Sequence, residues 1–380
     1  MKRIAILGST GSVGVSALEV VAAHPEAFEV SALACRSKAE LLAEQAKRFH
    51  VPRVALFEEG DLPTLKTRLN SGTQFFVGID GLLELVRSPE VDLVLVAIGG
   101  AQALQPTLEA IRQKKTVAIA NKESLVMAGT LLMEEAARFG ATIIPVDSEH
   151  SAIFQCLKAE DRSRLKKIYL TGSGGPLRTR SKESFGNLTQ EEVLAHPKWK
   201  MGKKITVDSA TLMNKALEVI EAHLLFGISC GAIEVLIHPE AVIHSMVEWV
   251  DGSVIAQLAL PDMKLPIQYA FSYPDRMEAS YPRLDFQEIR ALHFEAPDLD
   301  KFPCLQFGYE AARLGGSAPC VLNAANEEAV RAYLEGKISF TRIPPLIEAV
   351  MGRHRFQSVL GLEGLLGEDS LAREETRSRL

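Results

Sequence analysis

The chain has 380 residues, 47% of them hydrophobic, which is enough for about two or three domains with substantial apolar cores. Its net charge of −6 and its lack of long basic runs argue against nucleic acid or an anionic membrane surface as the main partner. The five cysteines are scattered without a CxxC pair, and neither a signal-peptide pattern nor a membrane-length apolar run is apparent. We therefore expect a reduced protein in the cytoplasm.

The first predicted strand, residues 3–7, runs into a glycine-rich stretch. Gly8, Gly11 and Gly14 form a GxxGxxG pattern that leads into an apolar helical pattern. Such a turn lets the N–H groups at a helix start hold a pyrophosphate. Further apolar strands alternate with helical stretches, at residues 28–34, 53–57, 74–77, 91–98, 116–120 and 142–146. This alternation predicts an α/β protein that begins with a Rossmann-like, doubly wound parallel sheet.

The second predicted strand ends without the acid that usually binds the ribose 2′-hydroxyl of NAD. Arg36, Ser37 and Lys38 follow it instead. A guanidinium, a hydroxyl and an ammonium group suit a 2′-phosphate, so the sequence favours NADP(H). The alternative is a solvated loop with incidental positive charge.

Polar residues also follow the last strand of this series. If the chain stays extended there, Asp147 and Glu149 share one face and Ser148 points away. Paired carboxylates suit a hard cation such as Mg²⁺ or Mn²⁺. The alternative is a strand that ends in solvated acids before a helix.

A comparable polar cluster follows residues 116–120. Asn121, Lys122 and Glu123 stand where parallel sheets of this kind bind ligands. Lys122 is a candidate for charge stabilisation or proton transfer. The alternative is a helix cap at Asn121 with Glu123 in the first turn, a role that is compatible with function.

Two further segments favour anion binding. Residues 171–176 form a glycine-rich turn around Ser173, typical of an anion cradle or of a simple turn. One continuous helix is predicted over residues 207–226, with Asp208 or Ser209 at its N-terminus.

That predicted helix carries a polar strip. Asn214 and Lys215 suit a phosphate, and Glu218 at the next turn could add a third metal carboxylate. The alternative is an ordinary Lys–Glu pair on a solvated face.

Six motifs in this order resemble the 1-deoxy-D-xylulose 5-phosphate reductoisomerase family, and the resemblance extends over essentially the whole chain. They occupy residues 8–14, 120–124, 146–150, 171–176, 196–202 and 207–215. The sequence departs from the family pattern at Val13, where Ile is common, and residues 35–37 fall in a stretch that varies in such enzymes. The resemblance implies an NADPH- and metal-dependent rearrangement and reduction of 1-deoxy-D-xylulose 5-phosphate to 2-C-methyl-D-erythritol 4-phosphate, in non-mevalonate isoprenoid synthesis.

The resemblance also implies the site residues. The metal ligands would be Asp147, Glu149 and Glu218, binding Mg²⁺ or Mn²⁺, with Co²⁺ as a third candidate. The substrate would contact Lys122, Ser148, Glu149, Ser173, His196, Ser209, Asn214, Lys215 and Glu218, of which Lys122, Glu149 and His196 would be catalytic. Trp199, the large aromatic residue of a polar loop, is a further candidate for contact with the substrate. NADPH would contact Thr10, Gly11, Ser12, Val13, Asn121, Glu123 and Gly202, in addition to Arg36 and Ser37, which the end of the second predicted strand indicates.

The expected domains are an NADPH-binding domain (1–147), an α+β catalytic and dimerisation domain (148–272), a linker (273–302) and a small C-terminal helical bundle (303–370). Residues 193–204, a polar loop around Trp199, are expected to form a lid over the site. Strands are predicted at residues 233–237, 242–250 and 253–260, and the resemblance implies that they help build a homodimer. The tail from Glu368 has many charges and few apolar residues, so we expect it to fray.

Two rival functions share parts of these patterns. A phosphorylating semialdehyde dehydrogenase requires a nucleophilic cysteine, and the nearest candidate, Cys156, stands in an apolar helical pattern without a neighbouring histidine partner. A non-catalytic NADP-sensing protein would have no use for three acids, an anion cradle and a lid. Metal-dependent NADPH oxidation with the phosphosugar distinguishes these functions.

Overall fold

The computed structural model describes residues 1–69, 72–158, 160–199, 201–279, 281–358 and 361–380. The chain divides into two compact units. Unit 1 comprises Met1–Ser124, Leu132–Ser151 and Asp262–Pro282; unit 2 comprises Leu125–Leu131, Ala152–Pro261 and Arg283–Leu380. Within the described ranges, no helix combines the length and the apolarity needed to cross a membrane.

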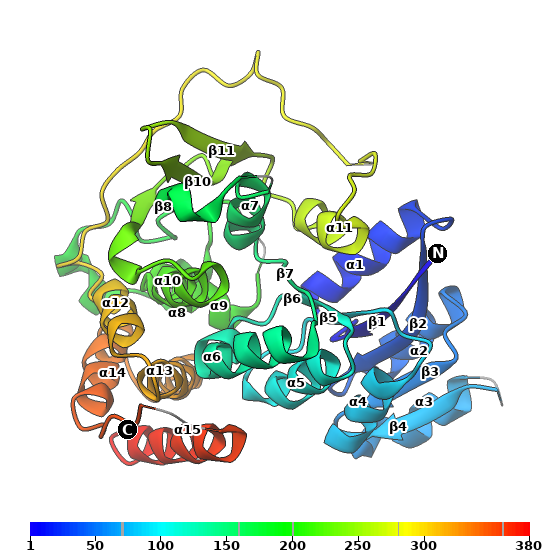
Figure 1. Cartoon of the computed structure of the whole chain (residues 1–380). Coiled ribbons are helices and arrows are strands. Elements are labelled where there is room, and N and C mark those ends of the chain that lie inside the picture. The colour runs from blue at the N-terminus through cyan, green and yellow to red at the C-terminus, as the bar shows by residue number, and fades with distance from the viewer. Residues whose placement is uncertain (70–71, 159, 200, 280, 359–360) are drawn as a thin grey trace. The chain divides into compact units, whose positions relative to one another are not determined.

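Unit 1 contains a seven-stranded parallel sheet with strand order β4-β3-β2-β1-β5-β6-β7 (Figure 1). Its strands are β1 (Lys2–Leu7), β2 (Phe28–Cys35), β3 (Arg53–Leu56), β4 (Gln74–Val77), β5 (Leu93–Val96), β6 (Thr116–Ile119) and β7 (Ile143–Pro145). β5 is apolar and buried at every position because helices cover both faces of such a sheet. The predicted doubly wound sheet is confirmed.

Helices connect these strands. They are α1 (Ser12–Ala23), α2 (Ala39–Arg48), α3 (Leu62–Arg68), α4 (Gly78–Arg87) and α5 (Leu104–Arg112). α6 (Lys122–Phe139) and α7 (Ser148–Cys156) contribute residues to both units. A later segment returns to unit 1 as α11 (Lys264–Ser272), which packs against α1 (Figure 1).

Unit 2 is built on a mixed four-stranded sheet with strand order β11-β10-β8-β9. β8 (Leu165–Gly172) pairs in parallel with β9 (Ile233–Ile237) and antiparallel with β10 (Ile243–Trp249), which pairs with the edge strand β11 (Val254–Leu258). The helices α8 (Gln190–Leu194), α9 (Lys203–Ala210) and α10 (Met213–Phe226) come between β8 and β9 in the chain.

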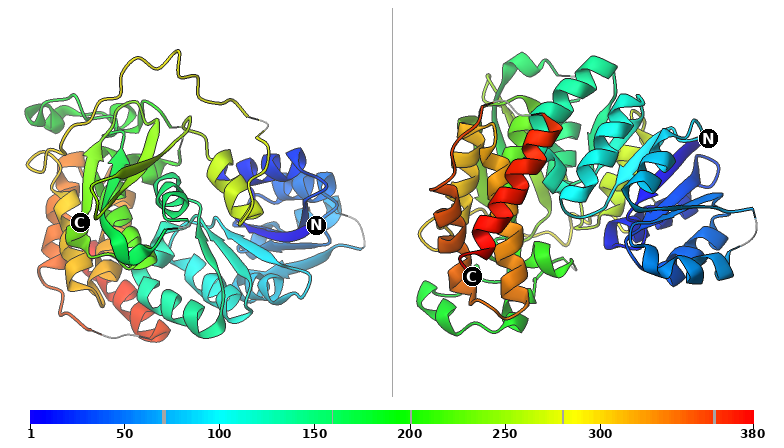
Figure 2. Two further views of the ribbon diagram at one scale, coloured as in Figure 1. Left: turned by 45° about the horizontal axis from the view of Figure 1, so that its top comes forward. Right: turned by 90° about the horizontal axis from the view of Figure 1, so that it is seen from below.

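The C-terminal helices of unit 2 form a small bundle, as predicted (Figure 2). They are α12 (Cys304–Leu314), α13 (Ala318–Leu334), α14 (Ile343–Met351) and α15 (Leu362–Arg377). The predicted fraying of the tail from Glu368 is wrong, because α15 continues through it and packs on α13. Arg373 on α15 pairs with Asp369 on the same helix and with Glu327 and Glu328 on α13. These ion pairs help to hold α15 on α13, although α15 has no wide apolar stripe.

Candidate functional site

The glycine-rich loop of unit 1 is closely packed. Gly8 has φ 101°, and a Cβ there would lie 2.4 Å from the carbonyl oxygen of Ala97. A Cβ at Gly14 would lie 2.3 Å from the carbonyl oxygen of Gly8. Glycine is therefore required at both positions. α1 begins at Ser12, so the N–H groups of its first turn have no acceptor within the helix and can bind an anion.

A residue that the sequence reasoning missed supports this loop. Gln45, buried on α2, donates from Nε2 to the carbonyl oxygen of Ser9 at 2.9 Å. The N–H groups of Gly8 and Ser9 both donate to the carbonyl oxygen of Ala34. The start of the loop is thus held by β2 and α2, and no local pattern in α2 could have indicated this contact.

Arg36 and Ser37 follow β2, as predicted. Arg36 is exposed, and its Nε lies 2.5 Å from Oε1 of Glu58. The sequence reasoning missed Glu58, which is 22 residues away and approaches Arg36 because β2 and β3 are paired. A 2′-phosphate at Arg36 would compete with this carboxylate.

The polar residues after β6 form both a helix cap and an ion pair. Asn121 caps α6, since its Oδ1 accepts from the Ser124 N–H at 2.7 Å, and its Nδ2 donates to Glu123 at 2.7 Å. The Lys122 ammonium is buried and pairs with Asp147, which follows the neighbouring strand β7. The capping interpretation is therefore correct, and it places Lys122 beside a predicted metal ligand.

The two acids after β7 come together by a different route from the one predicted. β7 ends at Pro145 and α7 begins at Ser148, so the segment is not extended and the alternation argument for Asp147 and Glu149 is wrong. The turn into the helix nevertheless leaves a carboxylate oxygen of each within 4.8 Å of the other. Ser148 Oγ donates to Glu149 Oε2 at 2.5 Å.

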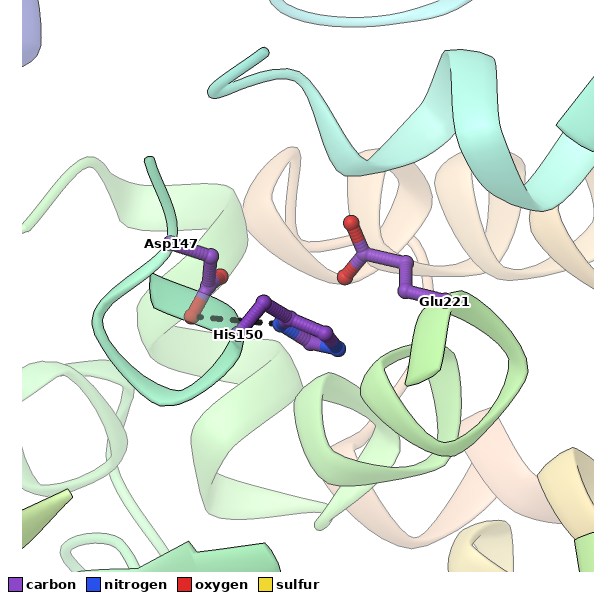
Figure 3. A group of neighbouring side chains, drawn as sticks. All are labelled: Asp147, His150 and Glu221. Atoms are coloured by element: carbon purple, nitrogen blue, oxygen red, sulfur yellow. Dashed lines mark ion pairs between the residues drawn. The ribbon is translucent and has the colours of Figure 1, made fainter. Parts of the chain in front are cut away.

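The side chain of His150 lies next to that of Asp147. Its ring is fully buried, and Nδ1 is 3.7 Å from Asp147 Oδ1 (Figure 3). Asp147 stands in the short connection between β7 and α7, and His150 is in the first turn of α7. Asp147 therefore contacts a lysine on one side and an imidazole on the other.

In unit 2, the glycine-rich turn after β8 approaches α9. Gly175 has φ 71°, and a Cβ there would lie 2.4 Å from the carbonyl oxygen of Ser209. Lys215 Nζ donates to the carbonyl oxygen of Thr171 at 2.5 Å. Ser173 Oγ lies 3.2 Å from His196 Nε2. The structure thus brings four of the predicted substrate contacts, Ser173, His196, Ser209 and Lys215, to one turn.

The helix predicted over residues 207–226 is interrupted, which corrects the prediction. α9 ends at Ala210 and α10 begins at Met213, with Leu212 left-handed at φ 57° between them. Ser209 therefore lies near the end of one helix rather than at its N-terminus. On one straight helix Ser209 and Asn214 would point about 140° apart. The break removes that constraint, so residues on both sides can face the same turn.

Glu218 is the most buried of the predicted ligands, with 1% of its side chain exposed. Asn214 Nδ2 donates to one carboxylate oxygen and Lys215 Nζ to the other, each at 2.5 Å. The predicted polar strip is therefore buried, so the interpretation as a solvated Lys–Glu pair is wrong. Two residues predicted to bind phosphate also bind the third predicted metal ligand.

His196 is held as a neutral imidazole. Burial lowers the pKa of His196 to about 4. Its Nδ1 accepts from the N–H groups of Lys198 and Trp199 at 3.2 and 2.9 Å. The proton of the neutral ring must then be on Nε2, which faces Ser173. His196 can therefore donate a hydrogen bond beside the glycine-rich turn without carrying charge.

The predicted lid segment, residues 193–204, begins beside the glycine-rich turn, because both contribute residues to one cavity. A cavity of about 270 Å³ is lined by Ser173, Gly175, Arg178, Pro197, Lys198, Pro239 and Glu240. Trp199 packs its ring against His244, with 6.4 Å between the ring centroids. Gly202 is exposed and precedes α9, while Lys200 lies outside the described residues.

The sequence matches three family models. Residues 4–129 match the model described as 1-deoxy-D-xylulose 5-phosphate reductoisomerase, residues 143–226 match the C-terminal domain of that enzyme, and residues 258–375 match the DXP reductoisomerase C-terminal domain.

Curated relatives agree over the full length. The 1-deoxy-D-xylulose 5-phosphate reductoisomerase of Thermodesulfovibrio yellowstonii is 47% identical over 100% of both chains. That of Desulforamulus reducens is 49% identical over 99% of this chain and 98% of its own.

Solved structures agree as well. The reductoisomerase from Zymomonas mobilis in complex with NADPH is 41% identical, with a TM-score of 0.93 over 100% of this chain and 98% of that one. A DOX-P reductoisomerase in complex with NADPH, fosmidomycin and magnesium is also 41% identical, with a TM-score of 0.94 over the same shares.

Proposed function

The chain belongs to the 1-deoxy-D-xylulose 5-phosphate reductoisomerase family, and from this premise we propose how its own residues perform the reaction. It is an NADPH- and divalent-metal-dependent enzyme that rearranges 1-deoxy-D-xylulose 5-phosphate and reduces the branched aldehyde to 2-C-methyl-D-erythritol 4-phosphate, in isoprenoid synthesis. The observation that carries the residue assignment is the glycine-rich turn of unit 2, where four predicted substrate contacts converge.

Asp147, Glu149 and Glu218 hold the metal. Their carboxylates are hard oxygen donors of the type that Mg²⁺ and Mn²⁺ prefer, with Co²⁺ as a third candidate. In the structure Lys122 neutralises Asp147, and Lys215 and Asn214 bind Glu218. Asp147 and Glu218 therefore each direct a carboxylate oxygen at an ammonium group, and Glu149 accepts from the Ser148 hydroxyl. When bound, the metal supplies Lewis-acid polarisation of the substrate oxygens.

The substrate phosphate is bound by Ser173, Ser209, Asn214 and Lys215. Two hydroxyls, an amide and an ammonium match its acceptor oxygens. Because the phosphate does not react, this binding energy positions the carbon skeleton. The buried position of Lys215 supports the assignment, since a desolvated ammonium attracts an anion strongly.

Lys122, Glu149 and His196 are the catalytic residues, and Ser148 and Trp199 also contact the substrate. Lys122 places positive charge where an oxyanion develops as the carbon–carbon bond breaks and re-forms. His196, neutral and protonated on Nε2, donates a hydrogen bond to the substrate without adding charge. Trp199 supplies apolar cover, and closure of residues 193–204 excludes water from the aldehyde.

NADPH is bound by the glycine-rich loop of unit 1 and by polar residues around it. The contacts are Thr10, Gly11, Ser12, Val13, Asn121, Glu123 and Gly202, with Arg36 and Ser37 on the 2′-phosphate. Gly11 and Ser12 are exposed at the start of α1, which leaves their backbone accessible to a pyrophosphate. The exposure of Arg36 likewise supports contact with a ligand.

The remaining assignments concern assembly and location. We propose a homodimer, because β11 is an edge strand whose Val254 and Ile255 are 48% and 39% exposed, and pairing with a second copy would cover them. We also propose that the enzyme is cytoplasmic and that its main partner is the phosphosugar rather than nucleic acid or membrane. Its proposed functional segments are the NADPH-binding domain (1–147), the catalytic and dimerisation domain (148–272), the linker (273–302) and the C-terminal helical bundle (303–370). None of the five cysteines, all of them in the described part of the chain, forms a disulfide, which supports a reducing compartment.

The decisive experiment follows NADPH absorbance in the presence of 1-deoxy-D-xylulose 5-phosphate, with and without Mg²⁺. We expect one NADPH oxidised per 2-C-methyl-D-erythritol 4-phosphate formed, and no oxidation after chelation until the metal is restored. NADPH oxidation that persists in chelator, or a product that keeps the unbranched skeleton, would overturn the assignment.

A further inference from the structure

A buried polar contact joins the C-terminal bundle to helix α9. Asn326 on α13 donates from Nδ2 to Oδ1 of Asp208 on α9 at 2.9 Å, across 118 positions of sequence. Asn326 is fully buried, and 1% of the Asp208 side chain is exposed. A carboxylate is unfavourable inside a protein unless charged or hydrogen-bonding groups compensate for the lost water. The position of α9 therefore depends on a group from the C-terminal bundle.

Asp208 has a second partner at the end of the predicted lid. Lys204 Nζ lies 2.9 Å from Asp208 Oδ2, one helical turn earlier on α9. The next residue after Asp208 is Ser209, whose carbonyl oxygen packs against Gly175 so closely that a Cβ there would lie 2.4 Å away. A small shift of α9 would consequently move Ser209 relative to the glycine-rich turn.

The other face of α13 is firmly held. Glu328 is 1% exposed and receives Arg377 Nε at 3.0 Å and Arg373 Nη1 at 3.3 Å, both from α15. α12 supports α10 in a similar way, because a Cβ on Gly308 would lie 2.5 Å from the carbonyl oxygen of Ala216. The bundle thus gives α9 and α10 a rigid base.

We propose that Asn326 is a positioning residue for substrate binding: through Asp208 it fixes α9 so that Ser209 meets the substrate phosphate and Lys204 holds the end of the lid. The inference rests on the proposed function in one respect, the role of Ser209 as a phosphate ligand. Asn326 does not itself touch the substrate. Its main effect is on the affinity of the phosphosugar, because eight of the nine proposed NADPH contacts lie in unit 1 and only Gly202 adjoins α9.

The test compares Asn326→Leu, which keeps the branched shape but removes the donor, with the exchanged pair Asp208→Asn/Asn326→Asp, which restores a donor and an acceptor in reverse order. We expect Asn326→Leu to raise KM for 1-deoxy-D-xylulose 5-phosphate roughly tenfold, while KM for NADPH changes by no more than about twofold. The exchanged pair should recover at least half of the loss in phosphosugar affinity on a logarithmic scale. If Asn326→Leu does not fold, Asn326→Ser, whose hydroxyl is too short to reach Asp208, takes its place.

Glu328→Gln is the matched control on the same helix. It weakens the contacts to α15, so it should lower Tm while leaving KM for the phosphosugar within about twofold. Ser209→Ala separates the two proposals: if it leaves KM unchanged, the phosphate assignment fails. If Ser209→Ala raises KM but Asn326→Leu does not, or if Glu328→Gln raises KM as much as Asn326→Leu, the positioning role of Asn326 is rejected.

Discussion

Two lysine–carboxylate pairs, one in each unit, hold predicted metal ligands in different ways. Lys122 and Asp147 follow neighbouring strands of the parallel sheet, with 9% and 15% of their side chains exposed. Lys215 and Glu218 stand three residues apart on α10, with 5% and 1% exposed. The first pair depends on the pairing of strands distant in sequence, whereas the second depends on helical spacing. The same chemical pairing can thus be built locally or by tertiary structure.

The difference matters for function because each lysine has a second assignment. Lys215 also donates to the carbonyl oxygen of Thr171 at the glycine-rich turn, where the phosphate is proposed to bind. Lys122 stands at the end of a strand beside the proposed metal. We therefore propose that charge at Lys215 serves phosphate binding and that charge at Lys122 serves the reacting oxygens.

The largest expected effect comes from removing a carboxylate of either pair. Asp147→Asn and Glu218→Gln each remove the charge of a proposed metal ligand, and we expect kcat/KM to fall about 10³-fold or more in both. Glu218→Gln should also lower the free energy of unfolding by about 3 kcal/mol, because the buried Lys215 ammonium loses its carboxylate partner. Steady-state kinetics at saturating Mg²⁺ and chemical denaturation measure the two quantities.

Wild-type turnover in Glu218→Gln would contradict the assignment of Glu218, the α10 residue, as a metal ligand. Glu221→Gln, three residues further on the same helix and also buried, is a useful control for helix disruption.

Replacing the lysines separates their roles. Lys215→Met should raise KM for the phosphosugar about 10²-fold, since a charge-assisted hydrogen bond contributes about 1.5–3 kcal/mol. Lys122→Met should instead lower kcat by about the same factor, with a smaller change in KM, because its charge acts where the oxyanion develops. If both variants change kcat and KM in equal proportion, the distinction between a binding lysine and a catalytic lysine is lost.

A third and exposed pair extends the comparison to the cofactor. Arg36 pairs with Glu58 at 2.5 Å, with 70% and 47% of the side chains exposed. We expect Arg36→Ala to raise KM for NADPH about tenfold and to leave KM for NADH nearly unchanged, because NADH lacks the 2′-phosphate. The effect on NADPH is modest because solvent weakens an exposed contact to phosphate. Glu58→Gln is the control and should lower KM for NADPH slightly, as it frees the guanidinium. Equal shifts for both cofactors would place the 2′-phosphate elsewhere.

The smallest effect concerns His196, the neutral neighbour of the positively charged Lys215 at the same turn. Because burial lowers the pKa of His196 to about 4, below the ordinary value of 6.5, folding favours the neutral ring. The stabilisation is complete above pH 6.5 and is lost as the pH falls toward 4. Between these values Tm should fall more steeply in the wild type than in His196→Asn, which has no titrating group there. Parallel Tm curves in scanning calorimetry would contradict the neutral assignment.

Much of the site could be predicted from the sequence because its signals are local. The glycine-rich loops, the buried β5 and the polar strip of Asn214, Lys215 and Glu218 all depend on residues within a few positions of one another. Spacing along a strand or helix determines which of these side chains can meet. The fold class and most of the proposed ligands follow from such patterns together with the family resemblance.

Tertiary structure alone decided the remaining features. No glycine or proline marks the break at Leu212. Pro145 marks the end of β7, but it does not by itself indicate that a helix begins at Ser148. α15 lacks a wide apolar stripe and is held by ion pairs to α13. The partners Gln45 for Ser9 and Asn326 for Asp208 lie 36 and 118 positions away. Spacing rules reach only about one helical turn, so contacts between distant segments appear only once the chain has folded.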